Sequence, residues 1–259
     1  MQSTRREFLK KAALAGISLA GGGVLHEVLS ANELSAELAR ETSVKTRWAM
    51  VVDMSRCAKR EHCTDCITAC RRAHNVPLIV SKRHEIKWIW KDSFEHAFPE
   101  LASDYLRSDL KASPFILLCN HCDNPPCVRV CPTKATWKRP DGIVMMDMHR
   151  CIGCRYCMAG CPYGSRSFNW MDPRKALKDS EINPEYPTRT KGVVEKCDFC
   201  AERIDRGLMP VCVTACPEKA LVFGNIADPD SAPRKILADR YTIRRKPELG
   251  TQPEVYYTV

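Results

Sequence analysis

The sequence lacks a hydrophobic run long enough to span a lipid bilayer. Its one extended apolar stretch, residues 12–24, is well short of the roughly 20 residues that a transmembrane helix needs, and it is rich in glycine. The chain also has no glycine-rich phosphate-binding loop and no nucleophile motif. We therefore expect any membrane attachment to come through a partner, and we expect no catalytic site in the chain itself.

Cysteine, by contrast, is abundant, because sixteen residues fall into four tight groups with none left over. In chain order the groups are Cys57, Cys63, Cys66 and Cys70; Cys119, Cys122, Cys127 and Cys131; Cys151, Cys154, Cys157 and Cys161; and Cys197, Cys200, Cys212 and Cys216. Group three has the C-x2-C-x2-C-x3-C-P spacing of bacterial ferredoxins, and groups two and four also end in x3-Cys-Pro. Zinc would explain a single C-x2-C pair, and disulfide scaffolds are usually shorter chains with wider spacing. The four groups together predict four [4Fe–4S] clusters.

The cysteine spacing also predicts local structure. Thiolates a few residues apart let a short irregular loop wrap one cubane and turn backbone N–H groups toward its sulfides. The proline after the fourth cysteine is expected to open a short helix, because its fixed φ suits a first helical turn. Short apolar runs predict strands at residues 48–52, 115–118, 143–146 and 220–223. This pattern indicates an α+β fold in which the clusters replace much of the conventional core.

The N-terminal segment has the layout of an export signal. The run S-T-R-R-E-F-L-K at residues 3–10 precedes the apolar stretch and resembles a twin-arginine signal, with a small-residue cleavage site near Ala31. We expect residues 1–31 to direct a folded, cluster-binding domain at residues 32–259 to the periplasm, peripheral to the membrane. The formal charge of +9 does not indicate nucleic-acid binding. Each cluster with its four thiolates would add a charge of about −2, and removal of the basic leader would lower the net charge further, so the loaded chain would be close to neutral.

Beyond these motifs, the chain resembles the four-cluster ferredoxin subunits of membrane-linked respiratory complexes. That group includes the electron-transfer subunits of polysulfide, dimethyl sulfoxide and nitrite reductases (PsrB, DmsB and NrfC). The resemblance runs from W-A-M-V-V-D at residues 48–53 to E-L-G-T-Q-P-E-V-Y-Y at residues 248–257. The leader and the stretch from E-I-K-W-I-W to H-A-F-P, residues 85–99, are most similar to the DsrO type, the periplasmic iron–sulfur subunits of DsrMKJOP complexes.

The resemblance implies two interleaved bacterial-ferredoxin-like halves. The outer half would comprise about residues 47–75 plus 190–226 and the inner half about residues 114–170, with a C-terminal tail at residues 227–259. The family pairing would place Cys57, Cys63, Cys66 and Cys216 on cluster 1; Cys70, Cys197, Cys200 and Cys212 on cluster 2; Cys119, Cys122, Cys127 and Cys161 on cluster 3; and Cys131, Cys151, Cys154 and Cys157 on cluster 4.

The same resemblance implies a function. The chain would relay electrons between an NrfD-type integral membrane subunit, which reacts with quinones, and other redox subunits of a sulfur-metabolism complex associated with sulfite reduction. A multihaem c-type cytochrome would be among them. Two alternatives stay open: a subunit of a molybdopterin-type or nitrite reductase complex, and a small reductase acting at an unusual cluster.

Group one departs from the family pattern. Five residues, 58–62, replace the usual interval of two, and Arg71 stands where other groups have proline. Its cluster is expected to be distorted or labile, and a three-cluster protein would lack this one. His62 and His121 lie beside or inside ligand loops, where a solvated or hydrogen-bonding role is favoured over ligation. Trp88 and Trp90 fit either ordinary packing or a docking surface.

Overall fold

The computed structural model describes residues 46–178 and 182–259. Residues 46–259 form one compact unit. The predicted export signal, residues 1–31, lies outside the described residues. Within the described residues, no helix has the length and apolar character needed to cross a bilayer.

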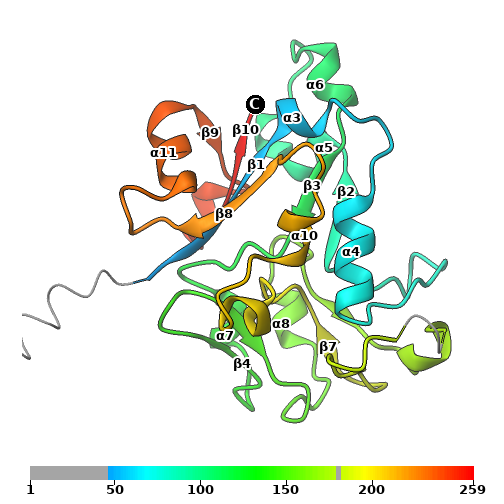
Figure 1. Ribbon diagram of the computed structural model, residues 1–259. Helices are drawn as coiled ribbons and strands as arrows, with labels where there is room; N and C mark the ends of the chain where they lie inside the picture. Colours follow the sequence, from blue (N-terminus) through cyan, green and yellow to red (C-terminus); the bar gives the residue numbers. More distant parts are fainter. Residues whose placement is uncertain (1–45, 179–181) are drawn as a thin grey trace, which may run out of the picture. The chain divides into compact units, whose positions relative to one another are not determined.

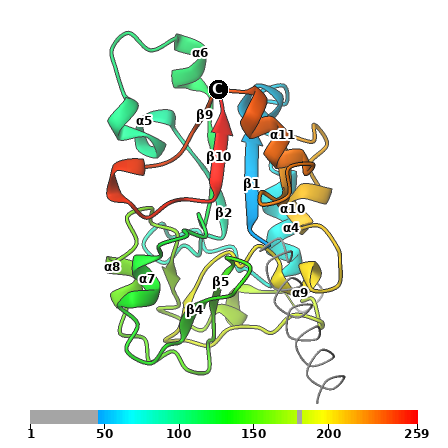
Figure 2. The same ribbon diagram turned by 90° about the vertical axis from the view of Figure 1, so that its left-hand side faces the viewer.

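One four-stranded sheet joins the two ends of this unit (Figures 1 and 2). Its strand order is β8 (Leu221–Asn225), β1 (Trp48–Asp53), β10 (Val255–Thr258) and β9 (Thr242–Ile243). Strand β1 pairs antiparallel with β8 and parallel with β10, so Met50 lies opposite both Phe223 and Val255. The strand predicted at residues 48–52 is confirmed, and the one predicted at 220–223 begins one residue later. Residues 227–259 are not a tail appended to the fold, because β10 is an inner strand of the sheet.

Three two-stranded ladders complete the strand structure. They pair β2 (Ile89–Asp92) with β3 (Phe115–Leu118), β4 (Thr136–Lys138) with β5 (Val144–Met146), and β6 (Ser167–Phe168) with β7 (Val194–Glu195), all antiparallel. The strand predicted at residues 115–118 is confirmed in full, and the one predicted at 143–146 begins one residue later.

The helices are short. They are α3 (Met54–Cys57), α4 (Asp65–Ala73), α5 (Phe94–Ala97), α6 (Ser108–Ala112), α7 (Pro126–Arg129), α8 (Tyr156–Ala159), α9 (Ala201–Ile204), α10 (Val211–Thr214) and α11 (Ala232–Asp239), with 3₁₀ turns η1 (Pro99–Leu101), η2 (Pro173–Ala176) and η4 (Pro247–Leu249).

The proline after the fourth cysteine does not open a helix, contrary to the prediction. In groups two and four it follows helices α7 and α10, and a turn closes when the Lys134 N–H donates to Cys131 O and the Lys219 N–H to Cys216 O. Proline cannot continue a helix, so it ends the segment there. Group one has Arg71 instead, and α4 runs on past Cys70 to Ala73.

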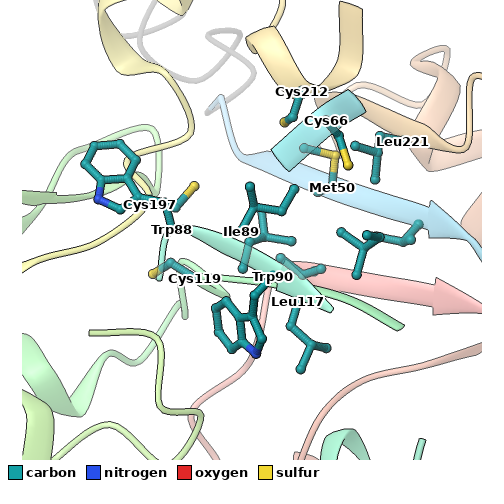
Figure 3. Packing of buried hydrophobic residues seen from close by; sticks show 14 of the residues in the cluster. Met50, Cys66, Trp88, Ile89, Trp90, Leu117, Cys119, Cys197, Cys212 and Leu221 are labelled. Atoms are coloured by element: carbon teal, nitrogen blue, oxygen red, sulfur yellow. The ribbon is translucent and has the colours of Figure 1, made fainter. Parts of the chain in front are cut away.

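A conventional core is present, so the prediction that clusters replace it was wrong for this part of the fold. Phe98 is completely buried, and its ring centroid lies 5.3 Å from those of Phe94, Phe115 and Tyr257. The main core also contains Trp88 and Trp90, which retain only 4% and 9% of their surface exposed (Figure 3). Packing is therefore confirmed for these two indoles.

Candidate metal centres

Each cysteine group contains a left-handed residue directly before its second cysteine. These residues are His62, His121, Gly153 and Phe199, with φ of 57°, 41°, 71° and 59°. A left-handed residue turns the chain so that successive N–H groups face one side, which favours an anionic ligand. Group one therefore keeps the same turn as the other groups, and its additional residues lie between Cys57 and that turn.

The first quartet assembles around helix α4. Cys57, Cys63, Cys66 and Cys216 line one pocket, with Ala220 and Leu221 beside them. Burial raises the pKa of the Cys66 thiol to about 12, and the nearby thiols of Cys212 and Cys57 add to this rise. Group one thus meets the last cysteine of group four despite its longer interval. Its predicted lability stays a prediction.

The second quartet is the most deeply placed, since Cys70, Cys197, Cys200 and Cys212 are all buried. Burial raises the pKa of Cys70 well above its usual value, and the neighbouring Cys197, Cys212 and Cys200 thiols raise it further. The insertion in group four folds into α9 and returns, so that Val211 N–H donates to Cys200 Sγ at 3.4 Å. The insertion therefore does not separate Cys212 from its group.

The third quartet lines a second pocket. Cys119, Cys122, Cys127 and Cys161 surround it, together with Tyr163 and Arg166. Burial raises the pKa of Cys161, and the nearby Cys119 thiol adds to the rise. The Arg166 guanidinium donates a hydrogen bond to Cys127 Sγ at 3.1 Å. A cationic donor to a ligand sulfur stabilises negative charge on it.

The group-three loop is the most exposed. Cys157 is buried on α8 and lies near Cys151, while Cys154 is exposed. Cys131 follows α7, which contacts α8, and its Sγ lies 3.7 Å from Thr133 Oγ1. The place of Cys131 beside the first three cysteines of group three rests on the family pairing.

Contacts between quartets give their spatial order. The Cys212 thiol of the second quartet raises the pKa of Cys66 in the first, and Cys119 of the third raises the pKa of Cys197 in the second. Cys127 of the third quartet raises the pKa of Cys157 and packs in the same buried cluster with it. The quartets therefore follow one another in a row. The second is entirely buried, whereas the first has three half-buried cysteines and the fourth has an exposed one.

The two histidines singled out in the ligand loops differ. His121 is 1% exposed, accepts a hydrogen bond from Val144 N–H at Nδ1 (3.0 Å), and stacks on Phe199 with ring centroids 3.7 Å apart. Burial and the charge of Lys196 hold its pKa well below the usual value, so the ring is neutral. A solvated role is excluded for His121, whereas His62 is exposed.

Three charged or polar neighbours of the quartets were missed from the sequence. His74 places Nδ1 3.7 Å from Cys70 Sγ, Arg166 contacts Cys127, and Lys196 is 2% exposed and donates to the carbonyls of Val144 and Cys197. Of the three, only Lys196 could have been picked out from the sequence, because it directly precedes the ligand Cys197. Arg166 lies five residues beyond Cys161, and its contact depends on the fold.

The donor set fits [4Fe–4S] clusters. All sixteen cysteines are free thiols. Backbone N–H groups of Phe199 and Ala220 donate to Cys197 Sγ and Cys216 Sγ at 3.5 and 3.2 Å, the kind of bond that stabilises cluster sulfurs. Because burial raises the pKa of thiols such as Cys66 and Cys70, deprotonated sulfur is stable there only with a cation, which cluster iron supplies.

Comparison with known proteins agrees with this chemistry. A family model described as a 4Fe-4S dicluster domain matches residues 112–178 and 182–226. The Hdr-like menaquinol oxidoreductase iron–sulfur subunit 1 of Archaeoglobus fulgidus is 43% identical over 98% of this chain and 97% of its own length. Protein NrfC of Escherichia coli is 35% identical over 99% of this chain and 95% of its own length. The chain belongs to the NrfC-like family of iron–sulfur subunits.

The chain is also similar to the arsenate respiratory reductase iron–sulfur subunit ArrB of a Shewanella species. ArrB is 36% identical over 82% of this chain and 95% of its own length. As a NrfC-like subunit with sixteen cysteines in four groups, the chain binds four [4Fe–4S] clusters in a ferredoxin-like α+β fold. The group-one cluster, for which the sequence left absence open, is thus included.

Proposed function

We propose that this NrfC-like chain relays electrons through its four clusters within an exported complex of dissimilatory sulfur metabolism, and has no catalytic site of its own. The observation that carries the proposal is the row of quartets, with a fully buried second quartet and more exposed cysteines in the first and fourth. Electron transfer weakens steeply with distance, so a donor and an acceptor must each reach an end of such a row.

The proposed ligand sets are those of the family pairing, one set for each cluster from 1 to 4. Two pockets support them, because one is lined by Cys57, Cys63, Cys66 and Cys216 and the other by Cys119, Cys122, Cys127 and Cys161. The close grouping of Cys70 with Cys197, Cys200 and Cys212 supports the second set. Cys131 completes the fourth set in this proposal.

The proposed partners are an NrfD-type integral membrane subunit at one end of the row and a multihaem c-type cytochrome at the other. The Archaeoglobus fulgidus relative is named as a subunit of a menaquinol oxidoreductase, which supports a quinol-linked place for this chain too. A periplasmic location is proposed from the twin-arginine motif at residues 3–10, and the link to sulfite reduction from the DsrO-like stretch at residues 85–99.

The test is to purify the tagged chain from detergent-solubilised membranes after low-salt and high-salt washes. We expect a polytopic membrane subunit to copurify and to survive moderate salt, because the loaded chain is close to neutral and salt screens only charge. A chain that leaves the membrane as a free monomer, and never copurifies with a membrane subunit, would show instead a soluble shuttle.

A second candidate is a subunit of a terminal reductase complex, which the similarity to ArrB favours. The same purification separates the two candidates. A large catalytic reductase subunit in the complex would support the second, whereas a c-type cytochrome detected by its haem absorbance would support the first. Turnover of a substrate by the purified chain alone would overturn both in favour of a small reductase.

A further inference from the structure

Arg166 is a buried arginine whose donors reach the cysteine loops. Arg166 is 5% exposed and directly precedes strand β6. One terminal nitrogen donates to Cys127 Sγ at 3.1 Å and to Thr136 Oγ1 at 2.7 Å, and the other lies 3.7 Å from Met146 Sδ. The Thr136 hydroxyl in turn donates to Met145 O at 2.7 Å, which fixes its lone pairs toward the guanidinium.

The charged neighbours of Arg166 are cysteines. Burial lowers the pKa of its guanidinium, and negative charge on Cys127, Cys157 and Cys119 raises it by more. Among residues 46–178 and 182–259, no carboxylate forms an ion pair with it. A buried cation without a counter-charge is strongly unfavourable. The anions that stabilise Arg166 are therefore the ligand sulfurs themselves.

These cysteines belong to two different groups. Cys127, which accepts the hydrogen bond from Arg166, is in group two, and Cys157, which packs in the same buried cluster as Cys127, is in group three. Under the ligand sets proposed above, on which this inference rests, the first serves cluster 3 and the second cluster 4. We propose that Arg166 is a positioning residue that bridges these two clusters and raises the reduction potentials of both.

The direction follows from charge. Reduction adds one electron to a cluster, and a fixed cation hydrogen-bonded to a ligand sulfur stabilises the more negative form. Arginine suits this place better than lysine, because its planar fork can donate to two sulfurs and a hydroxyl at once and stays charged when buried. Removing the cation is therefore expected to make clusters 3 and 4 harder to reduce, and to leave the potentials of clusters 1 and 2 unchanged.

The experiment is an EPR-monitored redox titration of the loaded protein with Arg166→Gln, Arg166→Lys and Thr136→Val. We expect two of the four cluster signals to move to more negative potential in Arg166→Gln, and the same two to move less in Arg166→Lys, which keeps the charge. Thr136→Val should move the same pair slightly, because it removes only the acceptor that orients the guanidinium. Cys157→Ala should abolish one signal of that pair.

Arg245→Gln is the matched control. Arg245 is equally buried, at 5% exposed, but its hydrogen bonds go to the carbonyls of Ala97 and Tyr163. Because Arg245 donates to no ligand sulfur, its replacement should move the cluster 3 signal less than Arg166→Gln does, and should leave the cluster 4 signal in place. The inference would be overturned if Arg166→Gln moved no signal, or moved all four equally. It would also be overturned if Arg245→Gln moved the pair as far, or if Cys157→Ala abolished a signal that Arg166→Gln does not shift. If Arg166→Gln fails to incorporate its clusters, unmoved signals in both Arg166→Lys and Thr136→Val would overturn it. A chain that loads four clusters but carries no electrons in the complex would defeat the proposed function alone.

Discussion

Replacing Gly153 with alanine tests two requirements of the group-three loop. These are its left-handed turn and its close contact with the backbone segment at Gly192. Gly153 has φ of +71°, and an added Cβ would lie 2.5 Å from Gly192 O and 3.2 Å from the Phe168 ring. A left-handed conformation costs a residue with Cβ roughly 1–2 kcal/mol. The contact with a backbone oxygen forces one of the two segments to move, and such overpacking costs about 1–3 kcal/mol. We therefore expect Gly153→Ala to destabilise the loaded protein by about 2–5 kcal/mol.

Gly250→Ala separates the two effects. Gly250 has φ of +63°, and an added Cβ would meet nothing within 4 Å, so only the conformational cost of about 1–2 kcal/mol applies. Both variants are compared with the unmodified protein in anaerobic guanidinium titrations, followed by the visible absorbance of the clusters and by iron content. Gly153→Ala should lose absorbance at the lower denaturant concentration, and one EPR signal should disappear before the others. Equal midpoints for the two variants would refute the reasoning.

Four further outcomes are expected. Anaerobic purification should yield about 16 iron atoms per chain and a matching amount of acid-labile sulfide, whereas about 12 would mean that group one is empty. Exchanging Arg5 and Arg6 for lysines should leave a loaded protein in the cytoplasm by cell fractionation, and undiminished export would contradict a twin-arginine signal. Cys157→Ala should remove one EPR signal and spare at least one from the group-one and group-four half; equal loss of all signals would argue against separate ligand sets. Stripping the iron with a chelator should leave a chain that is rapidly cleaved by protease, and full protease resistance without iron would show that the fold does not need its clusters.

The sequence allowed the local features of this protein to be predicted, because they depend on neighbouring residues. The run at residues 115–118 is apolar throughout, and it forms the completely buried strand β3. Group three carries the ferredoxin spacing, and its loop has a left-handed glycine before the second cysteine. Turn chemistry was less certain, since a proline that can begin a helix can equally follow one.

Long-range arrangement could not be predicted in the same way. Val255 pairs with Met50 across almost the whole chain, and nothing in the last residues marks them as an inner strand. The aromatic core around Phe98 combines residues from between the first two cysteine groups with Tyr257 near the C-terminus, and no local pattern indicates that they meet. The contact of Arg166 with Cys127 likewise depends on how β6 is positioned next to the group-two loop. The cysteine pairing needed the family, because spacing defines the groups but not their partners.

Two buried cations, Arg166 and Lys196, require the clusters as counter-charges, whereas the buried Arg189 pairs with Glu195. Without iron, burial keeps thiols such as Cys122 and Cys157 protonated, because it raises their pKa above the usual value. Neither Arg166 nor Lys196 forms an ion pair with a carboxylate of residues 46–178 or 182–259, so each would then be a buried, uncompensated charge, which costs several kcal/mol. With a cluster of charge about −2 next to each, the same cations become favourable. Folding and cluster loading are therefore coupled, since either one without the other leaves unpaired charge inside the protein. A chain built in this way has to receive its clusters where it folds, and the proposed export by a twin-arginine signal would require that order.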